Sequence, residues 1–491
     1  MVKPEQEVRA ARQDLYNLIA ELCSFITKKD SDNYLVSYSC LSEEEELRIE
    51  ERIEKNTPLA VSSGGAFVVI RDTDLTEEFL KNLRLFSTAL VLDDDRNCIM
   101  KLLQTLDGAL YLILQDEMER MSIHPGHMTE DADPADYDDM EIPADSGLDA
   151  LNTNEDEMGI RLIPRCQCVW ARKSRQYFSE RRLDIYLKYL IVVEKRRTSD
   201  IRDRHIFLPD GFFKSFDETK ELVIATTPLT LQSDFSIHFH RHQNIQSFTL
   251  DYNRPAAAAV NHLVWEKITE AGEKGAEMIV FPEMMGTETM EAAIREKLTG
   301  LPAKEQEKIP AMIILPSLFV RGHNFTSIID RRGNLLARQY KQNPYVMRCR
   351  HGNYMEGIEG SDEVVIFHYP GIGRFAVMIC KDFLTTRYME RIMRSFKLTL
   401  IIVPAYSTGA YDFQTSFETC AHDYCNVVWI NSCAALIPGK EKNFRYIGYT
   451  RRRISRYQTQ EDACHEMTPC VGLFSGKCRH DCLYLDTVGK V

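Results

Sequence analysis

From about residue 220 onward, short apolar runs alternate with helical stretches, and this alternation limits the possible folds more than any other feature of the sequence. A strong helical pattern over about 256–274 closes on a glycine, which is typical of a helix C-cap. Strand–helix–strand alternation of this kind is typical of layered α/β folds. The apolar runs are LVIAT, EMIVF, AMIIL, TSIID, LARQY, VVIFHY, FAVMIC, LTLIIVP and NVVWIN.

A chain of 491 residues is longer than a single core usually organises, so we expect more than one domain. Apolar periodicity before residue 215 predicts a mixed α/β region of unknown family, whereas 220–460 is predicted to be one α/β domain and 461–491 a cysteine-rich tail. In the first region we expect helices over 5–28, 43–55, 76–85 and 98–121, and short strands at 60–61 and 66–70.

Charge is unevenly distributed before residue 215. Residues 129–157 are rich in aspartate and glutamate and predict a mobile, solvated acidic loop. Residues 161–205 instead interleave cations with rings, including Trp170, Arg172, Tyr177 and Arg181. Such a segment could contact nucleic acid or a protein partner, or it could be an amphipathic element whose cations pair with the acidic loop.

Composition narrows the class of protein. The N-terminus has no apolar run behind a basic start, and no run is long enough to span a membrane, so we expect a cytoplasmic protein without a membrane partner. The net charge of −13 argues against a protein that coats nucleic acid along its whole surface. Its fourteen cysteines are then expected to be buried small side chains, a nucleophile or metal ligands rather than disulfides.

Three neighbourhoods bring reactive side chains to the ends of apolar runs. Glu283 follows the run at 277–281, Lys341 ends a short strand, and Cys380 lies where the run at 375–379 meets a helical stretch. A thiol becomes a good nucleophile when its proton is removed, which a carboxylate can do, and a following helix N-terminus should lower its pKa. A lysine can stabilise the oxyanion of a tetrahedral intermediate. Together these groups suit acyl transfer from nitrogen through a thioester.

The contexts of these residues resemble the nitrilase, or carbon–nitrogen hydrolase, superfamily over about 220–460. The first motif is Gly-Ala, a strand and Pro-Glu; the second is Asp-x-x-Gly, a strand, an aromatic residue and Lys; the third is Gly, a strand, Ile-Cys, one residue and Asp. They are matched in order by Gly275, Ala276, Pro282 and Glu283; by Asp330, Gly333, Tyr340 and Lys341; and by Gly373, Ile379, Cys380 and Asp382. After the third motif, the segments that end at Pro404 and Asn431 also resemble strands of the family.

The resemblance implies a nitrilase-like α-β-β-α sandwich and a Glu-Lys-Cys triad. Glu283 would be the general base, Lys341 the oxyanion stabiliser and Cys380 the nucleophile, with Glu356 as a second glutamate. It also implies a homo-oligomer paired through helices near the nucleophile, and no catalytic cofactor. The sequence departs from the family at Lys381, where an aromatic residue is usual, and at Thr386-Arg387, where Pro-Glu is usual.

Two further groups could bind metal. In the insertion at 229–250, His238, His240 and His242 alternate as on one strand face, and we interpret them as an exposed face rather than a metal site. The tail holds four thiols with short loops between them, which could form a structural zinc site or a packed cysteine-rich segment. These thiols are Cys464, Cys470, Cys478 and Cys482.

The leading functional prediction is a cytoplasmic, amidase-like hydrolase of a small, non-peptide amide. The alternative is a nitrilase-fold scaffold or effector with little hydrolase activity, within a larger assembly that could be defence-related and associated with nucleic acid. Nucleic-acid binding through 161–205 is a third reading, and it predicts a steep dependence of binding on salt.

Overall fold

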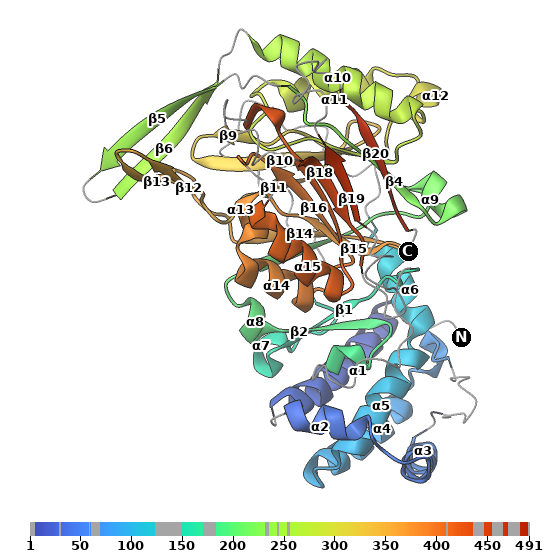
Figure 1. Cartoon of the computed structure of the whole chain (residues 1–491). Helices are drawn as coiled ribbons and strands as arrows, with labels where there is room; N and C mark the ends of the chain where they lie inside the picture. The colour runs from blue at the N-terminus through green and yellow to red at the C-terminus, as the bar shows by residue number, and fades with distance from the viewer. Residues whose placement is uncertain are drawn as a thin grey trace.

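The computed structural model contains two large β-sheets, a smaller projecting sheet and a helical N-terminal part (Figure 1). No helix among the described residues is long and apolar enough to cross a membrane. The structure describes residues 5–28, 31–57, 59, 69–122, 150–169, 183–230, 235–242, 245–252, 256–408, 411–435, 446–453, 465–469 and 482–489.

The first large sheet is built on parallel strands that are apolar on both sides. Ile224 pairs with Met278, which in turn pairs with Met312, so that β4, β7 and β8 run parallel. Antiparallel strands extend this sheet on both sides. In spatial order it contains β11 (Leu335–Tyr340), β10 (His323–Asp330), β8 (Met312–Ile314), β7 (Met278–Val280), β4 (Leu222–Thr226) and β20 (Tyr484–Val488), with β9 (Leu318–Val320) paired to β10.

The second large sheet lies opposite the first. Its central strands β15, β16 and β17 are parallel and fully buried, as expected when both faces of a sheet are covered. In spatial order the sheet contains β19 (His465–Pro469), β18 (Tyr446–Arg451), β17 (Asn426–Asn431), β16 (Leu400–Ala405), β15 (Gly373–Val377), β14 (Glu363–Tyr369) and β3 (Arg202–Phe207).

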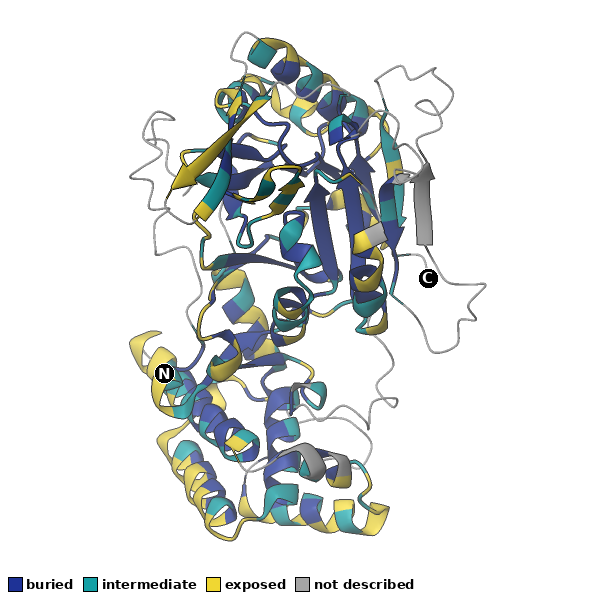
Figure 2. Cartoon of the chain, turned by 60° about the vertical axis from the view of Figure 1, so that its left-hand side comes forward, coloured by how far each residue is buried: buried dark blue, intermediate teal, exposed yellow. Residues whose placement is uncertain are grey.

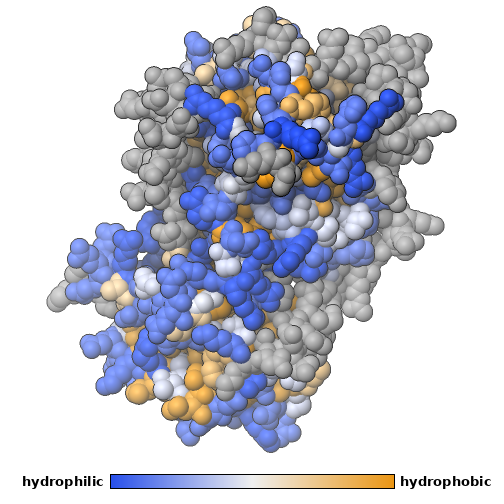
Figure 3. Space-filling model, turned by 90° about the vertical axis from the view of Figure 1, so that its left-hand side faces the viewer, coloured by the Kyte–Doolittle hydropathy of each residue, from blue (hydrophilic) through white to orange (hydrophobic). Residues whose placement is uncertain are grey.

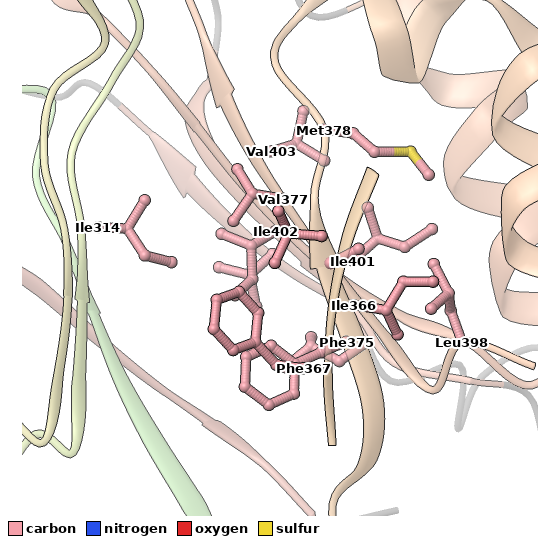
Figure 4. Packing of buried hydrophobic residues seen from close by; sticks show 14 of the residues in the cluster. Ile314, Ile366, Phe367, Phe375, Val377, Met378, Leu398, Ile401, Ile402 and Val403 are labelled. Atoms are coloured by element: carbon pink, nitrogen blue, oxygen red, sulfur yellow. The ribbon is translucent and has the colours of Figure 1, made fainter. Parts of the chain in front are cut away.

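The core between the two sheets explains why they pack face to face. Phe367 and Phe375 stack with ring centroids 5.2 Å apart and point toward Ile314 of the first sheet (Figure 4). Residues on the other face of the second sheet, such as Ile401, point toward its covering helices (Figure 4).

Helices cover the outer faces of both sheets, and this arrangement confirms the α-β-β-α sandwich predicted from the sequence. The first sheet is covered by α10 (Ala257–Glu273) and α11 (Met290–Thr299), which share a buried cluster with its strands. The second is covered by α14 (Thr386–Ser395) and α15 (Gln414–His422). The short helices α9 (Lys214–Thr219) and α12 (Ala303–Gln306) lie in connections.

The sheets take in strands from outside the predicted 220–460 range. β3 lies in the predicted N-terminal region yet pairs with β14, and β19 and β20 come from the predicted tail. The strand pairing of the sandwich therefore extends from residue 202 to residue 488. The sequence pattern missed this because these strands, RDRHIF, HEMTP and YLDTV, contain charged and polar residues instead of a continuous apolar run.

The N-terminal part has a buried core of its own. The predicted face of the first helix is confirmed, because Leu15, Ile19, Leu22 and Ile26 are all buried. The helices are α1 (Glu5–Lys28), α2 (Ser31–Tyr38), α3 (Glu43–Asn56), α4 (Glu77–Leu92), α5 (Arg96–Ala109), α6 (Tyr111–Arg120), α7 (Glu155–Met158) and α8 (Lys195–Thr198), beside a two-stranded sheet of β1 (Ile160–Pro164) and β2 (Leu190–Glu194).

The predicted insertion forms an antiparallel hairpin that projects from the sandwich (Figure 1). Most of its outer strand is exposed (Figure 2). Figure 3 shows the side of the molecule on which the hairpin projects, where apolar and hydrophilic side chains are mixed. His238, His240 and His242 lie on this strand and are exposed. The hairpin strands β5 (Phe235–His242) and β6 (Ile245–Tyr252) are joined by β13 (Gly352–Glu356) and β12 (Val346–Cys349) into one four-stranded sheet.

Several sequence predictions concern residues outside the described part of the chain. Most of the acidic segment lies there, as do residues 170–182 of the basic segment. Of the four tail thiols only Cys482 is described, so the zinc site stays a prediction. Among the described residues no group of His, Cys, Asp or Glu is arranged to hold a metal ion.

Candidate active site

The four residues singled out from the sequence come together between the ends of the two large sheets. Glu283 lies just beyond β7, Lys341 directly follows β11, and Glu356 ends β13. Cys380 follows β15 and begins the short helix α13 (Lys381–Leu384). Strands thus deliver all four side chains to one place, although the side chains are up to 97 residues apart in the sequence, from 283 to 380.

Lys341 is the centre of the hydrogen-bond network. Its ammonium Nζ donates to Glu283 Oε1 at 2.7 Å and to Glu356 Oε2 at 2.6 Å. All three side chains are buried. Burial favours the neutral amine, but the two carboxylates outweigh it and raise the pKa of Lys341 well above its usual value. The lysine is therefore a fixed cation in a site that holds two carboxylates.

The Cys380 thiol lies against Glu283, with which it is hydrogen-bonded. Burial raises the pKa of Cys380 above its ordinary value, and the negative charge of Glu283 adds to the rise. Lys341 and the backbone N–H of Tyr406 oppose it without reversing it. Burial is thus the largest influence on the pKa of this thiol, and a lowering of that pKa by the N-terminus of α13 stays a prediction from the sequence.

The charge on Glu283 is shaped by the same surroundings. Burial raises the pKa of this carboxyl group, whereas Lys341 lowers it. Its Oε2 accepts from the Tyr406 backbone N–H at 2.9 Å, which fixes the carboxylate in place. A carboxylate with a raised pKa, hydrogen-bonded to a protonated thiol, is suited to act as a general base.

Cys380 also has an unusual backbone. Its φ of 45° and ψ of −94° put it outside the regions that non-glycine residues prefer. Its N–H donates to Pro404 O at 2.9 Å, so the neighbouring strand β16 holds the conformation. Strained backbone conformations of this kind cluster at functional sites.

Asp382, two residues after the cysteine, ties the nucleophile to the lysine strand. Its Oδ1 accepts from the backbone N–H groups of Gln342 at 3.0 Å and Asn343 at 2.7 Å. Burial raises the pKa of Asp382 to about 7, although these hydrogen bonds act in the opposite direction. Asp382 therefore fixes the start of α13 against the residues that follow Lys341.

Asn324 is a member of the site that the sequence did not reveal. Its amide Nδ2 donates to Glu283 Oε1 at 3.0 Å and to Glu356 Oε1 at 3.1 Å. Its Oδ1 accepts from Ser317 Oγ at 2.8 Å. An isolated Asn near the start of a strand carries no spacing signal, and only its position before the Lys341 strand could have suggested it.

The two departures from the family pattern lie on the helices that follow the proposed nucleophile, α13 and α14. Lys381 is in the first turn of α13, directly after the proposed nucleophile. Arg387 lies on α14 and lines a separate cavity of about 430 Å³ together with Asn343 and Tyr388. After burial, the groups that most affect the pKa of the thiol are Glu283, Lys341 and the backbone N–H of Tyr406.

Comparison with known proteins gives a partial structural similarity. No family model and no curated protein matches the chain. A mutant of the Nesterenkonia AN1 amidase, from the nitrilase superfamily, is 14% identical with a TM-score of 0.30 and covers 43% of this chain and 76% of its own. The C. elegans NitFhit protein is 18% identical with a TM-score of 0.35 and covers 51% of this chain and 61% of its own. These values describe a distant similarity over about half of the chain and do not assign an activity.

Proposed function

We propose that the chain is a nitrilase-type carbon–nitrogen hydrolase that cleaves a small, non-peptide amide through a thioester on Cys380. The observation that carries the proposal is the buried network in which Lys341 binds both Glu283 and Glu356 while Glu283 contacts the Cys380 thiol. Such a base, cation and thiol are the groups that acyl transfer from nitrogen requires.

The reaction proceeds in two halves. Glu283 removes the thiol proton as the Cys380 sulfur bonds to the amide carbon, and Lys341 stabilises the negative oxygen of the tetrahedral intermediate. The carbon–nitrogen bond then breaks, and Glu283 returns the proton to the departing amine. Water, activated by Glu283, next attacks the thioester, releasing the carboxylic acid and regenerating the thiol.

Glu356 and Asn324 support this chemistry by position. Glu356 Oε2 accepts both from Lys341 and from the Tyr345 backbone N–H at 2.9 Å, so it anchors the ammonium group. Asn324 holds the other oxygen of Glu356 beside Glu283. The two residues keep the lysine and the base in one geometry, and a misplacement of about 1 Å in such a site can cost about 10²-fold in rate.

Selective alkylation tests the proposal. Iodoacetamide should label Cys380 at least tenfold faster than Cys349 at neutral pH, as followed by mass spectrometry of the two peptides. Replacing the base, Glu283→Gln, should slow Cys380 labelling by about 10²-fold, the usual contribution of a general base. Glu277→Gln is the matched control, because Glu277 is a buried carboxylate just before β7 whose partners Ser215 and Arg331 lie outside the site.

The alternative function gives the opposite result. If Cys380 reacts no faster than Cys349, and Glu283→Gln has no effect, the site is not an activated nucleophile. A scaffold or effector role of the sandwich would then be the better reading. Homo-oligomer formation, a cytoplasmic location and a macromolecular partner of residues 161–205 remain predictions from the sequence.

A further inference from the structure

The cavity of about 430 Å³ beside α14 lies where the N-terminal part meets the sandwich. Asp200, which follows α8 of the N-terminal part, forms one side of its wall. Arg387 and Arg391 of α14 form another, and Gln342, the residue after Lys341, forms a third. A cavity of this volume is large enough to hold a small molecule.

The lining of this cavity is polar. Among the described lining residues, all except Ile201 have a polar or charged side chain. An apolar ligand would cover these groups without giving them a partner, at a cost of about 1–3 kcal/mol for each. The cavity therefore suits a ligand that is itself rich in hydrogen-bonding groups.

Three hydrogen-bond donors of α14 lack a partner among the residues that the structure describes. Arg387 forms neither an ion pair nor a side-chain hydrogen bond with them, and the Tyr388 hydroxyl group forms no hydrogen bond. The third donor, Arg391 Nε, is enclosed by protein, where an unpaired donor is rare. An oxyanion brings a negative charge and several acceptor oxygens, so it would satisfy donors of this kind.

The two carboxylates of the lining are already paired with arginines. Asp200 accepts from Arg391 Nη1 at 2.8 Å and from Nη2 at 3.1 Å, and Asp362 Oδ1 accepts from Arg202 Nε at 2.8 Å. Arg387 is close enough to Asp200 to contribute to the lowered pKa of that carboxyl group, of which the hydrogen bond from Arg391 is the main cause. Three guanidinium groups thus stand against two carboxylates, which favours an anion.

Two acceptor oxygens of the lining are also open toward the described part of the chain. Gln342 Nε2 donates to Tyr340 O and Glu363 O, whereas Gln342 Oε1 accepts no hydrogen bond from a described residue. The same holds for Asp362 Oδ2, because Arg202 binds only Oδ1. Hydroxyl groups of a ligand would donate to these two oxygens.

The cavity is one hydrogen bond away from the segment of the proposed nucleophile. Asn343, another lining residue, donates through Nδ2 to Asp382 Oδ1 at 2.8 Å and through its backbone N–H at 2.7 Å. Asp382 is two residues after Cys380. A ligand in the cavity would therefore restrain together the loop after Lys341 and the helices after Cys380.

We propose that this cavity is an effector site for a small hydroxylated oxyanion, either a phosphate monoester or a carboxylate, and that the bound anion restrains the proposed active site. Binding of the anion is independent of the proposed function, whereas its effect at Cys380 rests on that function. Cys380 is only 4% exposed, so a reagent reaches the thiol through local opening, which the bound anion opposes.

Isothermal titration with three matched probes tests the binding. Glycerol 3-phosphate, glycerate and glycerol share a three-carbon skeleton, but only the first two carry an oxyanion. At least one of the two anions should have a Kd about tenfold or more below that of glycerol, as expected for charge-assisted hydrogen bonds. The tighter of the two identifies the oxyanion as phosphate or carboxylate. No binding of either anion, or the same Kd for all three probes, would overturn the proposal.

A matched pair of variants locates the anion. Arg387→Gln and Arg394→Gln each remove one positive charge from α14, but Arg394 pairs with Asp423 and is not a lining residue. The Kd of the tighter anion should rise about tenfold or more in Arg387→Gln. It should rise less than about twofold in Arg394→Gln, where only a screened, distant charge is lost. Equal effects of the two variants would mean that the anion binds elsewhere.

Alkylation of Cys380 tests the effector role. A saturating concentration of the tighter anion should slow labelling by iodoacetamide about fivefold or more in the wild type, within the usual range of coupling between two sites. The same concentration should leave the rate unchanged in Arg387→Gln. An unchanged rate in the wild type would overturn the effector role. Slow labelling of Cys380 without any anion would instead contradict the proposed function, so the two failures are distinguishable.

Discussion

Asn324 shows at the residue scale how one neutral side chain organises a charged site. Its amide group donates to Glu283 and to Glu356, two buried carboxylates that would otherwise repel each other across Lys341. Its carbonyl group is held by Ser317, so the orientation of the amide is fixed. A hydrophobic residue of the same size would leave both carboxylate oxygens without this donor.

We expect Asn324→Leu to lower the rate of Cys380 alkylation by about 10²-fold, comparable to the loss of one donor at a preorganised site. Asn152→Leu is the control, because Asn152 is also buried and donates to Ile160 O at 3.0 Å in the N-terminal part. Both variants should lower the melting temperature, but only Asn324→Leu should slow alkylation. Equal alkylation rates in the two variants would show that Asn324 has only a structural role.

Some residues of the site could be predicted from the sequence and others could not. The positions of Glu283, Lys341 and Cys380 could be predicted because each lies in a local motif, and that of Glu356 because the resemblance implies a second glutamate. Asn324 could not, because its role depends on three strands meeting in space. The Tyr406 contribution is a backbone N–H, which every residue except proline has, so no residue type marks it.

The projecting hairpin shows at the element scale how an insertion can become part of a site. Phe248 of β6 is in register with Glu356 of β13, and Phe239 of β5 is in register with Phe248. Phe248 is only 1% exposed, whereas Phe239 is 50% exposed. Phe248 thus packs beside the strand residue that anchors Lys341. The sequence predicted the strand and its exposed histidines but not its pairing with β13, because pairing between distant strands leaves no local pattern.

The two phenylalanines give a matched test of this role. Phe248→Ala should lower the free energy of unfolding by about 3 kcal/mol or more, as expected for a buried Phe. It should also slow Cys380 alkylation, because Glu356 loses the packing that positions its strand. Phe239→Ala should cost less than about 1 kcal/mol and leave alkylation unchanged. Chemical denaturation measures the free energy of unfolding of each variant. Similar losses of free energy in the two variants would mean that Phe248 does not pack more tightly than Phe239.

At the scale of the whole molecule, the small sheet of β1 and β2 joins the core of the N-terminal helices to the core of the sandwich. Leu162 and Val192 face the helical core, whereas Ile163 and Val193 face the core of the sandwich. Arg161 of β1 also forms an ion pair with Asp203 of β3. The N-terminal region predicted as separate is therefore in direct contact with the sandwich. The sequence did not indicate this, since a short strand that is apolar on both sides reads like any buried strand.

Beside this junction lies a buried chain of polar groups that should make the whole fold sensitive to acid. His205 Nε2 lies 2.7 Å from Asp203 Oδ2, and its Nδ1 lies 2.7 Å from His368 Nε2. Burial lowers the pKa of both histidines well below 6.5, and the nearby Arg161 adds to this for His205. For His368 the added causes are His205 and Arg374. Both rings are therefore neutral in the folded protein at neutral pH.

The sign of the pH effect follows from these shifts. Unfolded histidines take up protons near pH 6.5, but the folded ones do so only at a much lower pH, so the unfolded state binds more protons between the two values. The stabilisation is fully present above pH 6.5 and is lost as the pH falls, by up to about 1.4 kcal/mol per pH unit for each histidine. Replacing one of them, His368→Gln, should lower the slope of unfolding free energy against pH between pH 6 and 5 by about the contribution of one proton, about 1.4 kcal/mol per pH unit. His262→Gln is the control, because the His262 side chain is 65% exposed on α10. Urea denaturation over this pH range measures both slopes, and a His368→Gln slope equal to that of the wild type would mean that His368 is already protonated in the folded state.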